Sequence, residues 1–468
     1  MTGAHFDALE TREPAARERA LLARLAAQLA HAKAASAYFR DTLACVDPAA
    51  VNSRAALARL PVARKSGLMA LQQAAPPFGG LNATPASGLA RIFVSPGPIY
   101  DPEGRRPDFW RTARALFAAG FRAGDVVLNG FSYHLTPAGS MFETGLHRLG
   151  CAVIPGGVGQ TEMQARVIAD LKPSGYVGTP SFLRLIVEKC DELGLDASSL
   201  RRALVSGEAF LPPVREFLRA RGVDAYQAYG TADLGIIAYE TPARAGLVVD
   251  EEAIVEIVRP GTGDPVPDGE VGEVVVTPFN EDYPLVRFAT GDLSAVLPGA
   301  SPCGRTNTRI KGWLGRADQT TKVRGMFVHP EQVAEVAARH GLGRARLVVE
   351  NEGGNDRMTL CIERDGAPDP ALMQAVEATL REVTKLRGGV HFVAAGSLPY
   401  DGKVIEDAQA RLTGALAAPG ARIPAGPLTP VDERRAARAR CPTGGPTTFS
   451  TCGTSRQPRT PRSTPRPA

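Results

Sequence analysis

The sequence lacks any apolar run long enough to cross a membrane, and it does not begin with a hydrophobic signal segment. The stretch 1–36, MTGAHFDALETREPAARERALLARLAAQLAHAKAAS, is charged and helix-like instead. With 44% hydrophobic and 22% charged residues, the composition is that of a soluble globular protein. We therefore expect a cytoplasmic protein without a membrane partner.

Cysteine patterns that bind metal or form disulfide frameworks are also missing. The seven cysteines are scattered without C-x-x-C spacing, so the sequence predicts neither a zinc site nor a set of disulfides. Cys303, in the stretch SPCGRTN, stands alone and is expected to be a turn residue.

A basic surface for nucleic acid is missing as well, although the net charge is +5. Residues 411–468 carry ten arginines against two acidic residues, so the rest of the chain is slightly acidic. A nucleic-acid-binding domain needs basic residues on its folded body, so nucleic acid is not expected as a partner. From residue 413 on, the chain is rich in Pro, Arg and Thr without hydrophobic periodicity, and the tail 413–468 is predicted to be disordered.

What the sequence does contain is a regular alternation of helical and strand-like stretches. Residues 1–75 favour helices, and between about 110 and 230 the two kinds of stretch alternate every 25 residues or so. This spacing predicts βα units and a parallel sheet. From about 245 to 300, strands follow one another without helices, which indicates an antiparallel portion. We therefore expect an α/β fold, with a large domain that extends to residue 317 and a small α/β domain at 318–412.

The loops that follow the predicted parallel strands are polar or glycine-rich: NGFSYH, PGGVGQ, VGTPS, VSGEAF and AYGTAD. Because the carboxyl ends of parallel strands meet at one edge of a sheet, these five loops predict a ligand site there. The alternative is that strand ends simply need turn residues.

The stretch RIFVSPGPIYDPEG, residues 91–104, has the position of a phosphate-binding loop but little of its chemistry. A strand-like run leads into Ser95, the only hydroxyl before two prolines that donate no N–H. Tyr100, Arg105 and Arg106, just downstream, are candidates to replace the missing phosphate contacts.

Five motifs occur in a specific order: GEAF, YGTAD, RFATGDL, RIKGWLGRADQTTKVRG and LPYDGK. In this order they resemble the adenylate-forming acyl-CoA ligases, most closely the phenylacetate–CoA ligase family. The stretch RLPVARKSGLMALQQAAPPFGGLNA is similar to that family's N-terminal segment, and the resemblance extends from residue 5 to about 410. It implies that residues 76–317 form an AMP-binding adenylation domain and that the small domain after it is mobile.

The resemblance also implies an activity. Members of the family activate a carboxylic acid with ATP and Mg²⁺, release pyrophosphate, and pass the acyl group from the acyl-adenylate to coenzyme A. For this chain an aryl or related acid is expected, and a homodimer is an option by analogy. Two alternatives stay open: transfer to a carrier-protein thiol, and an adenosine- or acyl-binding homologue that has lost ATP activation.

Candidate nucleotide-binding residues follow from the resemblance. Asp292 is expected to accept hydrogen bonds from both ribose hydroxyls, with Arg316 as a second ribose contact. Tyr229 offers a ring for stacking on adenine, although a core tyrosine is nearly as good an interpretation. The full expected set is Ser95, Gly97, Gly207, Glu208, Ala209, Tyr229, Gly230, Thr231, Asp292 and Arg316.

Asp233 matches the acid that the family uses near magnesium, since Mg²⁺ prefers oxygen ligands and keeps most of its waters. The family usually has Ser or Thr one residue earlier, where this chain has Ala232. In the phosphate loop only Ser95 and Gly97 remain. One preorganised donor contributes about 3 kcal/mol to transition-state stabilisation, so these departures predict slow adenylation unless other groups substitute.

Three further roles come from the same resemblance. Lys403 matches the family's mobile catalytic lysine, and Asp318 matches the hinge about which the small domain rotates. The acyl pocket is expected near the first two strand-end loops, with candidates Phe131, Tyr133, His134, Gly156 and Gly157. A solvent-exposed lysine and a structural histidine are the plain alternatives for Lys403 and His134.

Overall fold

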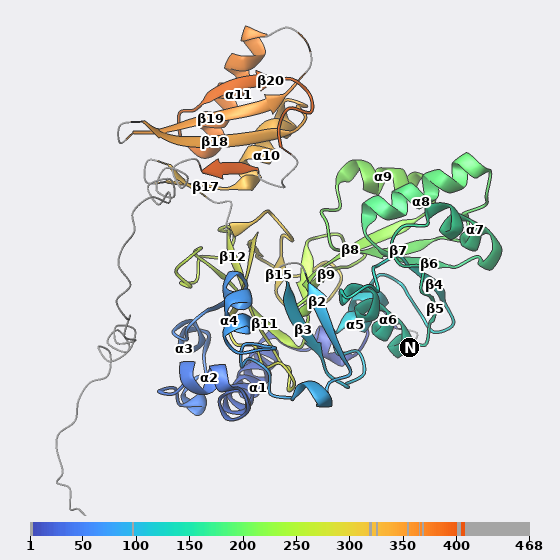
Figure 1. The fold of residues 1–468 in the computed structure, drawn as a ribbon, viewed down its shortest axis with the longest axis vertical. Helices are drawn as coiled ribbons and strands as arrows, with labels where there is room; N and C mark the ends of the chain where they lie inside the picture. The colour runs from blue at the N-terminus through green and yellow to red at the C-terminus, as the bar shows by residue number, and fades with distance from the viewer. Residues whose placement is uncertain are drawn as a thin grey trace, which may run out of the picture. The chain divides into compact units, whose positions relative to one another are not determined.

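The computed structural model of the chain describes residues 3–95, 98–317, 321–323, 326–352, 355–364, 366, 369–399 and 404–407 (Figure 1). It has the α/β architecture that the sequence predicts, with a parallel set of strands, an antiparallel portion and a small α/β portion near the C-terminus. Among these described residues, no helix is both long enough and apolar enough to span a bilayer.

Helices make up most of the N-terminal segment. The longest, α1, begins at Pro14, and the Glu13 carboxylate accepts hydrogen bonds from the N–H groups of Ala15 and Ala16 at 2.9 and 2.7 Å. Its buried face carries leucines at four-residue spacing. The elements of the segment are η1 (Ala8–Thr11), α1 (Pro14–Ala35), α2 (Ala37–Thr42), η2 (Pro48–Ala50), α3 (Arg54–Ala58), β1 (Ala63–Arg64), η3 (Lys65–Gly67), α4 (Leu68–Ala74) and η4 (Ala86–Gly88).

The main sheet has the strand order β14-β15-β10-β9-β8-β7-β6-β4-β5. From β5 to β8 the strands are parallel, as the βα spacing predicts. Along the chain, one helix follows each of the strands β4, β5, β6 and β7. The parallel units are α5 (Thr112–Ala118), β4 (Val126–Asn129), α6 (Ala138–Leu149), β5 (Ala152–Ile154), α7 (Thr161–Leu171), β6 (Gly175–Gly178), α8 (Pro180–Leu193), β7 (Arg202–Val205), α9 (Pro212–Ala220) and β8 (Asp224–Thr231).

Both faces of the parallel strands are covered by helices. On β6, Tyr176 packs into the core beneath α7 and α8, whereas its neighbour Val177 packs toward α5 and α6. The same alternation occurs on β4, where Val127 and Leu128 enter different cores. Burial on both faces explains why these strands are almost wholly apolar in the sequence.

The antiparallel portion begins earlier than the sequence suggests. Strand β9 (Gly235–Glu240) turns back directly on β8 inside the main sheet, and β10 (Leu247–Val249), β15 (Arg309–Ile310) and β14 (Val296–Leu297) follow. A second sheet has the order β1-β13-β12-β11, with β11 (Ala253–Val258), β12 (Gly272–Pro278) and β13 (Phe288–Ser294) antiparallel. Its core is shared with the N-terminal helices.

The stretch around Ser95 is a β-hairpin rather than a strand followed by an open loop. Strands β2 (Arg91–Ser95) and β3 (Ile99–Glu103) pair antiparallel, with Ser95 opposite Ile99 and Arg91 opposite Glu103. The backbone N–H of Val94 also donates to the Leu135 carbonyl at 2.8 Å. The hairpin therefore lies beside the loop that follows β4.

The small C-terminal portion has its own apolar core. Strands β18 and β19 pair antiparallel, and Pro330 is the first residue of helix α10. The sheet order is β20-β19-β18-β21. Its elements are β16 (Thr321–Val323), β17 (Met326–Val328), α10 (Pro330–Arg339), β18 (Ala345–Glu352), β19 (Asn355–Glu363), α11 (Pro370–Thr384), β20 (Gly389–Val393) and β21 (Ile405–Asp407).

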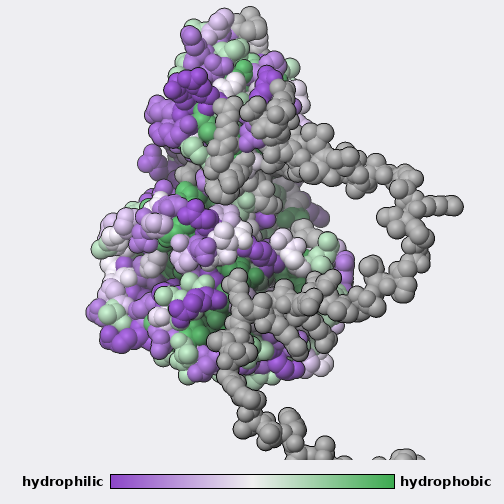
Figure 2. Space-filling model, turned by 90° about the vertical axis from the view of Figure 1, so that its left-hand side faces the viewer, coloured by the Kyte–Doolittle hydropathy of each residue, from purple (hydrophilic) through white to green (hydrophobic). Residues whose placement is uncertain are grey.

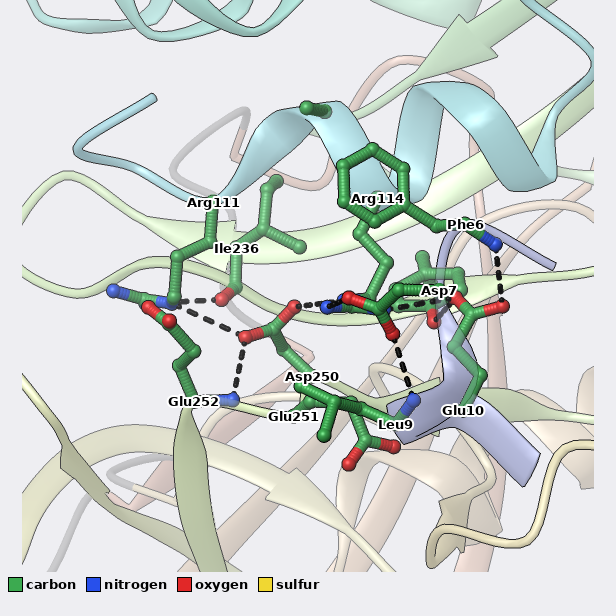
Figure 3. Close-up of polar contacts among 12 residues, drawn as sticks. Phe6, Asp7, Leu9, Glu10, Arg111, Arg114, Ile236, Asp250, Glu251 and Glu252 are labelled. Carbon is green, nitrogen blue, oxygen red and sulfur yellow. Dashed lines mark hydrogen bonds and ion pairs between the residues drawn. The ribbon is translucent and has the colours of Figure 1, made fainter. Parts of the chain in front are cut away.

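A buried ion network joins the N-terminal residues to α5 and to the residue after β10 (Figure 3). Arg114 donates to both oxygens of Asp7 at 3.0 and 2.8 Å, and its Nε lies 3.7 Å from Asp250. Glu10 accepts from the Tyr239 hydroxyl and pairs with Arg305, at 2.9 Å in each case. Residues 7–10 are therefore part of the folded body.

The surface seen in Figure 2 mixes hydrophilic and hydrophobic residues in small groups. On that face, the described residues present no broad apolar patch, which is ordinary for a globular protein. Cys303 lies in a turn, as predicted.

Candidate active site

Adjacent strand-end loops contact one another at the carboxyl edge of the parallel sheet. A Cβ on Gly207 would lie 3.6 Å from the Thr179 side chain and 3.8 Å from the Phe131 ring. The backbone N–H of Gly157 donates to the Asn129 carbonyl at 2.9 Å. The loops after β4, β5, β6 and β7 thus form one continuous surface, as the order of polar loops predicts.

Asp292 and Tyr229 lie together in the structure. The Tyr229 hydroxyl donates to Asp292 Oδ2 at 3.0 Å, and Asp292 is 8% exposed. Thr290 Oγ1 lies 3.2 Å from the same hydroxyl. Burial, and then the charge of Asp292, raise the pKa of Tyr229 well above its ordinary value, so the phenol stays a donor.

Two donors from one later segment hold the other oxygen of Asp292. Arg316 Nη1 lies 3.2 Å and Trp313 Nε1 lies 3.1 Å from Asp292 Oδ1. The Trp313 residue is nevertheless 49% exposed, so its ring is accessible beside the carboxylate. A hollow of about 210 Å³ borders this group and is lined by Arg64, Ser66, Thr290, Gly291 and Arg316 among others.

Asp233 is buried, and its carboxylate pairs with a lysine from the N-terminal segment. Lys65 Nζ lies 2.5 Å from Asp233 Oδ2. The other oxygen, Oδ1, has no hydrogen-bond partner. Asp101, on β3, interacts electrostatically with both residues, and burial followed by the charge of Asp233 raises the pKa of Asp101 to about 8.

The loop residues before Asp233 are partly exposed, and the Thr231 hydroxyl accepts from the Leu234 N–H at 3.2 Å. Gly230 precedes it at the end of β8. On the β7 loop, Gly207, Glu208 and Ala209 are exposed. The Glu208 carboxylate accepts from the N–H of Ser181 at 2.6 Å, in the first turn of α8.

The expected acyl-pocket residues divide into apolar and polar groups. Phe131 stacks on Phe142, with ring centroids 4.5 Å apart. The Tyr133 hydroxyl is engaged, because it donates to Glu143 at 2.6 Å, whereas His134 is exposed. The Gly156–Gly157 backbone is held by the Gln164 amide, which donates to the Gly157 carbonyl at 3.0 Å.

Arg105 and Arg106, expected as substitutes for phosphate contacts, lie past the far end of the hairpin from Ser95. Their guanidinium groups donate to the Gly88 carbonyl and to Glu252, each at 3.0 Å. Tyr100 pairs through its backbone with Gln72. None of these contacts brings them to Ser95.

Lys65, Asp101, Gln164 and Trp313 were not among the residues expected from the sequence. Lys65 and Trp313 lie inside stretches that resemble the family, so those stretches could have identified them. Asp101 could not be found in this way, because it becomes a site residue only through the hairpin register. Gly97, Asp318 and Lys403 lie outside the described residues.

The AMP-binding enzyme family model matches residues 109–278. The crystal structure of 2-hydroxyisobutyryl-CoA ligase in an open conformation, in complex with 2-HIB-AMP and CoA, has the same fold, with a TM-score of 0.76 at 24% identity over 87% of this chain and 95% of that chain. The same ligase in the postadenylation state with 2-HIB-AMP gives a TM-score of 0.72 at 25% identity, over 89% and 94%. The fold and the family model together indicate an AMP-binding enzyme.

Two curated relatives define the family more closely. The phenylacetate–coenzyme A ligases of Aromatoleum evansii and of Thermus thermophilus are each 32% identical to this chain over 335 residues, which cover 68% of this chain and 74% of the relative. The chain belongs to the phenylacetate–coenzyme A ligase family. Its class is that of the ATP-dependent, AMP-forming carboxylate–CoA ligases.

Proposed function

We propose that the chain activates an aryl or related carboxylic acid with ATP and transfers the acyl group to coenzyme A. A carboxylate oxygen attacks the α-phosphorus of ATP, the bond to the β-phosphate breaks, and pyrophosphate leaves. The sulfur of coenzyme A then attacks the acyl carbon, and the bond to the AMP oxygen breaks.

The observation that carries this proposal is the hydrogen-bonded group around Asp292. Three donors from two segments, Tyr229, Trp313 and Arg316, fix both oxygens of one partly accessible carboxylate. A carboxylate held in this way can accept hydrogen bonds from two neighbouring ribose hydroxyls without reorganising. The exposed Trp313 ring adds a flat surface for the nucleotide or for the pantetheine arm.

Asp233 supplies an oxygen ligand at the phosphate side of the site. A bound Mg²⁺ there would neutralise charge on the phosphates, and the unpartnered Oδ1 of Asp233 fits it. Lys403 would place a cation at the α-phosphate, where negative charge accumulates in the transition state. Its role remains a proposal because the residue lies outside the described ranges.

The acid is proposed to lie against Phe131. The rings of Phe131 and Phe142 stack on one another, and no atom lies within 4 Å of where a Cβ on Gly157 would stand. An apolar surface beside a residue without a side chain suits a flat apolar acyl group. Magnesium as the cofactor, a cytoplasmic location and a homodimer belong to the same proposal, as does the division of the chain at 75, 317 and 412.

Pyrophosphate release across a panel of aryl and short-chain carboxylic acids tests the function. We expect release with at least one aryl acid and, on addition of coenzyme A, a product whose mass is that of the acyl-CoA. A product found only with a phosphopantetheinyl carrier protein would reassign the acceptor. No release with any acid, while AMP still binds, would identify a binding protein instead of a ligase.

A further inference from the structure

A hollow of about 430 Å³ is lined by residues at the open end of the β2–β3 hairpin and by the second half of α6. We call it the arginine hollow. Its volume is within the range of small-molecule sites, roughly 300–1,000 Å³. Its charged side chains are the acids Glu103 and Asp108 and four arginines, Arg91, Arg105, Arg106 and Arg148. Positive charge is therefore in excess there, four charges against two.

Both acids of the arginine hollow are already bound within the protein. Glu103 is 2% exposed, and its two oxygens accept from Arg91, an indole N–H and a serine hydroxyl at 2.7, 3.1 and 3.1 Å. Asp108 caps the start of α5, where its carboxylate accepts from two backbone N–H groups at 2.8 and 3.1 Å. Neither acid pairs with Arg105, Arg106 or Arg148.

Two of the four guanidinium groups have no acidic partner. Across the part of the chain that the structure describes, the Arg148 side chain forms no hydrogen bond or ion pair, and Arg105 donates only through Nε, to the Gly88 carbonyl at 3.0 Å. Arg106 shares the Glu252 carboxylate with a second arginine. All three side chains of the hollow are exposed. A basic residue in the last turn of a helix is favourable, which explains Arg148 in α6 but leaves its guanidinium unbound.

The donors of the arginine hollow suit phosphate. A guanidinium group binds a phosphate through two parallel N–H···O bonds, with more geometric specificity than an ammonium group offers. One phosphate group can use one or two arginines in this way. Four arginines around one hollow therefore favour an anion whose charge is spread over two neighbouring phosphate groups.

We propose that the arginine hollow binds a small molecule with a diphosphate group, at a site separate from the adenylate site. Arg105 and Arg148 donate to the phosphate oxygens, and Arg91 and Arg106 add positive charge. The two sites are apart because α6 begins at Ala138, just after the loop at the carboxyl edge of the sheet, and Arg148 lies ten residues further along, about 15 Å. The inference goes beyond the proposed function and does not depend on it.

Calorimetric titration of the full chain with pyrophosphate, in the presence of saturating AMP, tests this site. We expect a pyrophosphate site that Arg105→Gln and Arg148→Gln each weaken about tenfold, since each variant loses hydrogen bonds to a charged group. Arg201→Gln, which removes the same charge from an exposed position outside the hollow, is the matched control and should not change the Kd. Circular dichroism checks that each variant folds.

Competition experiments then identify the source of the diphosphate. Displacement of pyrophosphate by ADP or coenzyme A, lost in Arg148→Gln, would assign the site to a nucleotide diphosphate, and binding of pyrophosphate alone would assign it to the free anion. Inorganic phosphate that binds as tightly as pyrophosphate would contradict a diphosphate ligand. Equal Kd values for pyrophosphate in the wild type, Arg105→Gln and Arg148→Gln would overturn the site altogether.

Discussion

At the scale of single residues, Tyr229 has a contact that its sequence position does not reveal. A tyrosine in YGTAD suggests a ring for stacking, and the structure adds a hydroxyl that donates to Asp292 at 3.0 Å. The residue is 8% exposed, so little of the ring faces solvent. We infer that Tyr229 acts mainly as a positioning residue that holds the Asp292 carboxylate for the ribose.

Tyr229→Phe should therefore weaken AMP binding without unfolding the protein. Loss of a hydrogen bond to a charged group removes about 1.5 kcal/mol, which corresponds to roughly a tenfold higher Kd for AMP by calorimetry. Tyr226→Phe on the same strand is the control, because that hydroxyl donates to Asp224 instead. Equal Kd values for wild type and Tyr229→Phe would exclude the positioning role.

At the same scale, the sequence predicts Asp292 and Arg316 as a pair because their motifs occur in order, and the structure places their side chains 3.2 Å apart. It does not predict Asp101. Asp101 lies between prolines, in a stretch whose composition is typical of a turn. Only the strand register that sets Phe93 opposite Asp101 places it in the buried site. Such long-range placement leaves no local signal.

At the scale of elements, the parallel strands could be predicted because burial on both faces makes them continuous apolar runs. The connection between the N-terminal residues and α5 could not be predicted from the sequence. It depends on Arg111 and Arg114 meeting Asp7, Glu10 and Asp250, which are far apart in sequence (Figure 3). A charged side chain within a helix, or directly before one, is usually exposed, but Arg114 in α5 and Arg111 before it are both buried.

This network should make stability depend on pH. Burial raises the pKa of Asp250 to about 6 from its ordinary 3.8, while Arg111 and Arg114 oppose the shift and Glu252 adds to it. As pH rises from 4 to 6, the unfolded chain releases this proton while the folded chain keeps it. The contribution of Asp250 to the free energy of unfolding is therefore present at pH 4, and it falls by on the order of 2 kcal/mol as the pH rises to 6.

Urea unfolding of wild type and Asp250→Asn at about pH 4 and pH 6.5 measures this effect. The wild type should lose stability relative to the variant as pH rises, because asparagine has no proton to retain. Other titrating groups are common to both proteins and cancel in the difference. Parallel pH profiles would show that Asp250 titrates near its ordinary value.

At the scale of the whole molecule, catalysis is proposed to depend on residues outside the described ranges. Lys403→Ala should lower pyrophosphate release by about 10²- to 10³-fold, since a preorganised cation at the α-phosphate is lost. The circular dichroism spectrum should not change. Lys189→Ala, which breaks a surface ion pair with Glu192, is the control and should retain full activity.

Rotation of the small domain predicts a different pattern for Asp318→Pro. A proline fixes φ and should restrict a hinge, so thiol transfer should slow more than adenylation. Single-turnover measurement of acyl-adenylate formation and of acyl-CoA formation separates the two steps. Equal losses in both would argue against a hinge at this position.

Strand β1 pairs in parallel with β13, the strand that carries Asp292, and the next residue, Lys65, reaches Asp233. Detachment of this short edge strand would remove the backbone support of one aspartate and the counter-charge of the other together. Protease cleavage in the first 66 residues and release of bound nucleotide should then occur at the same temperature on heating. Detachment of the N-terminal helices would thus release the bound nucleotide from the enzyme.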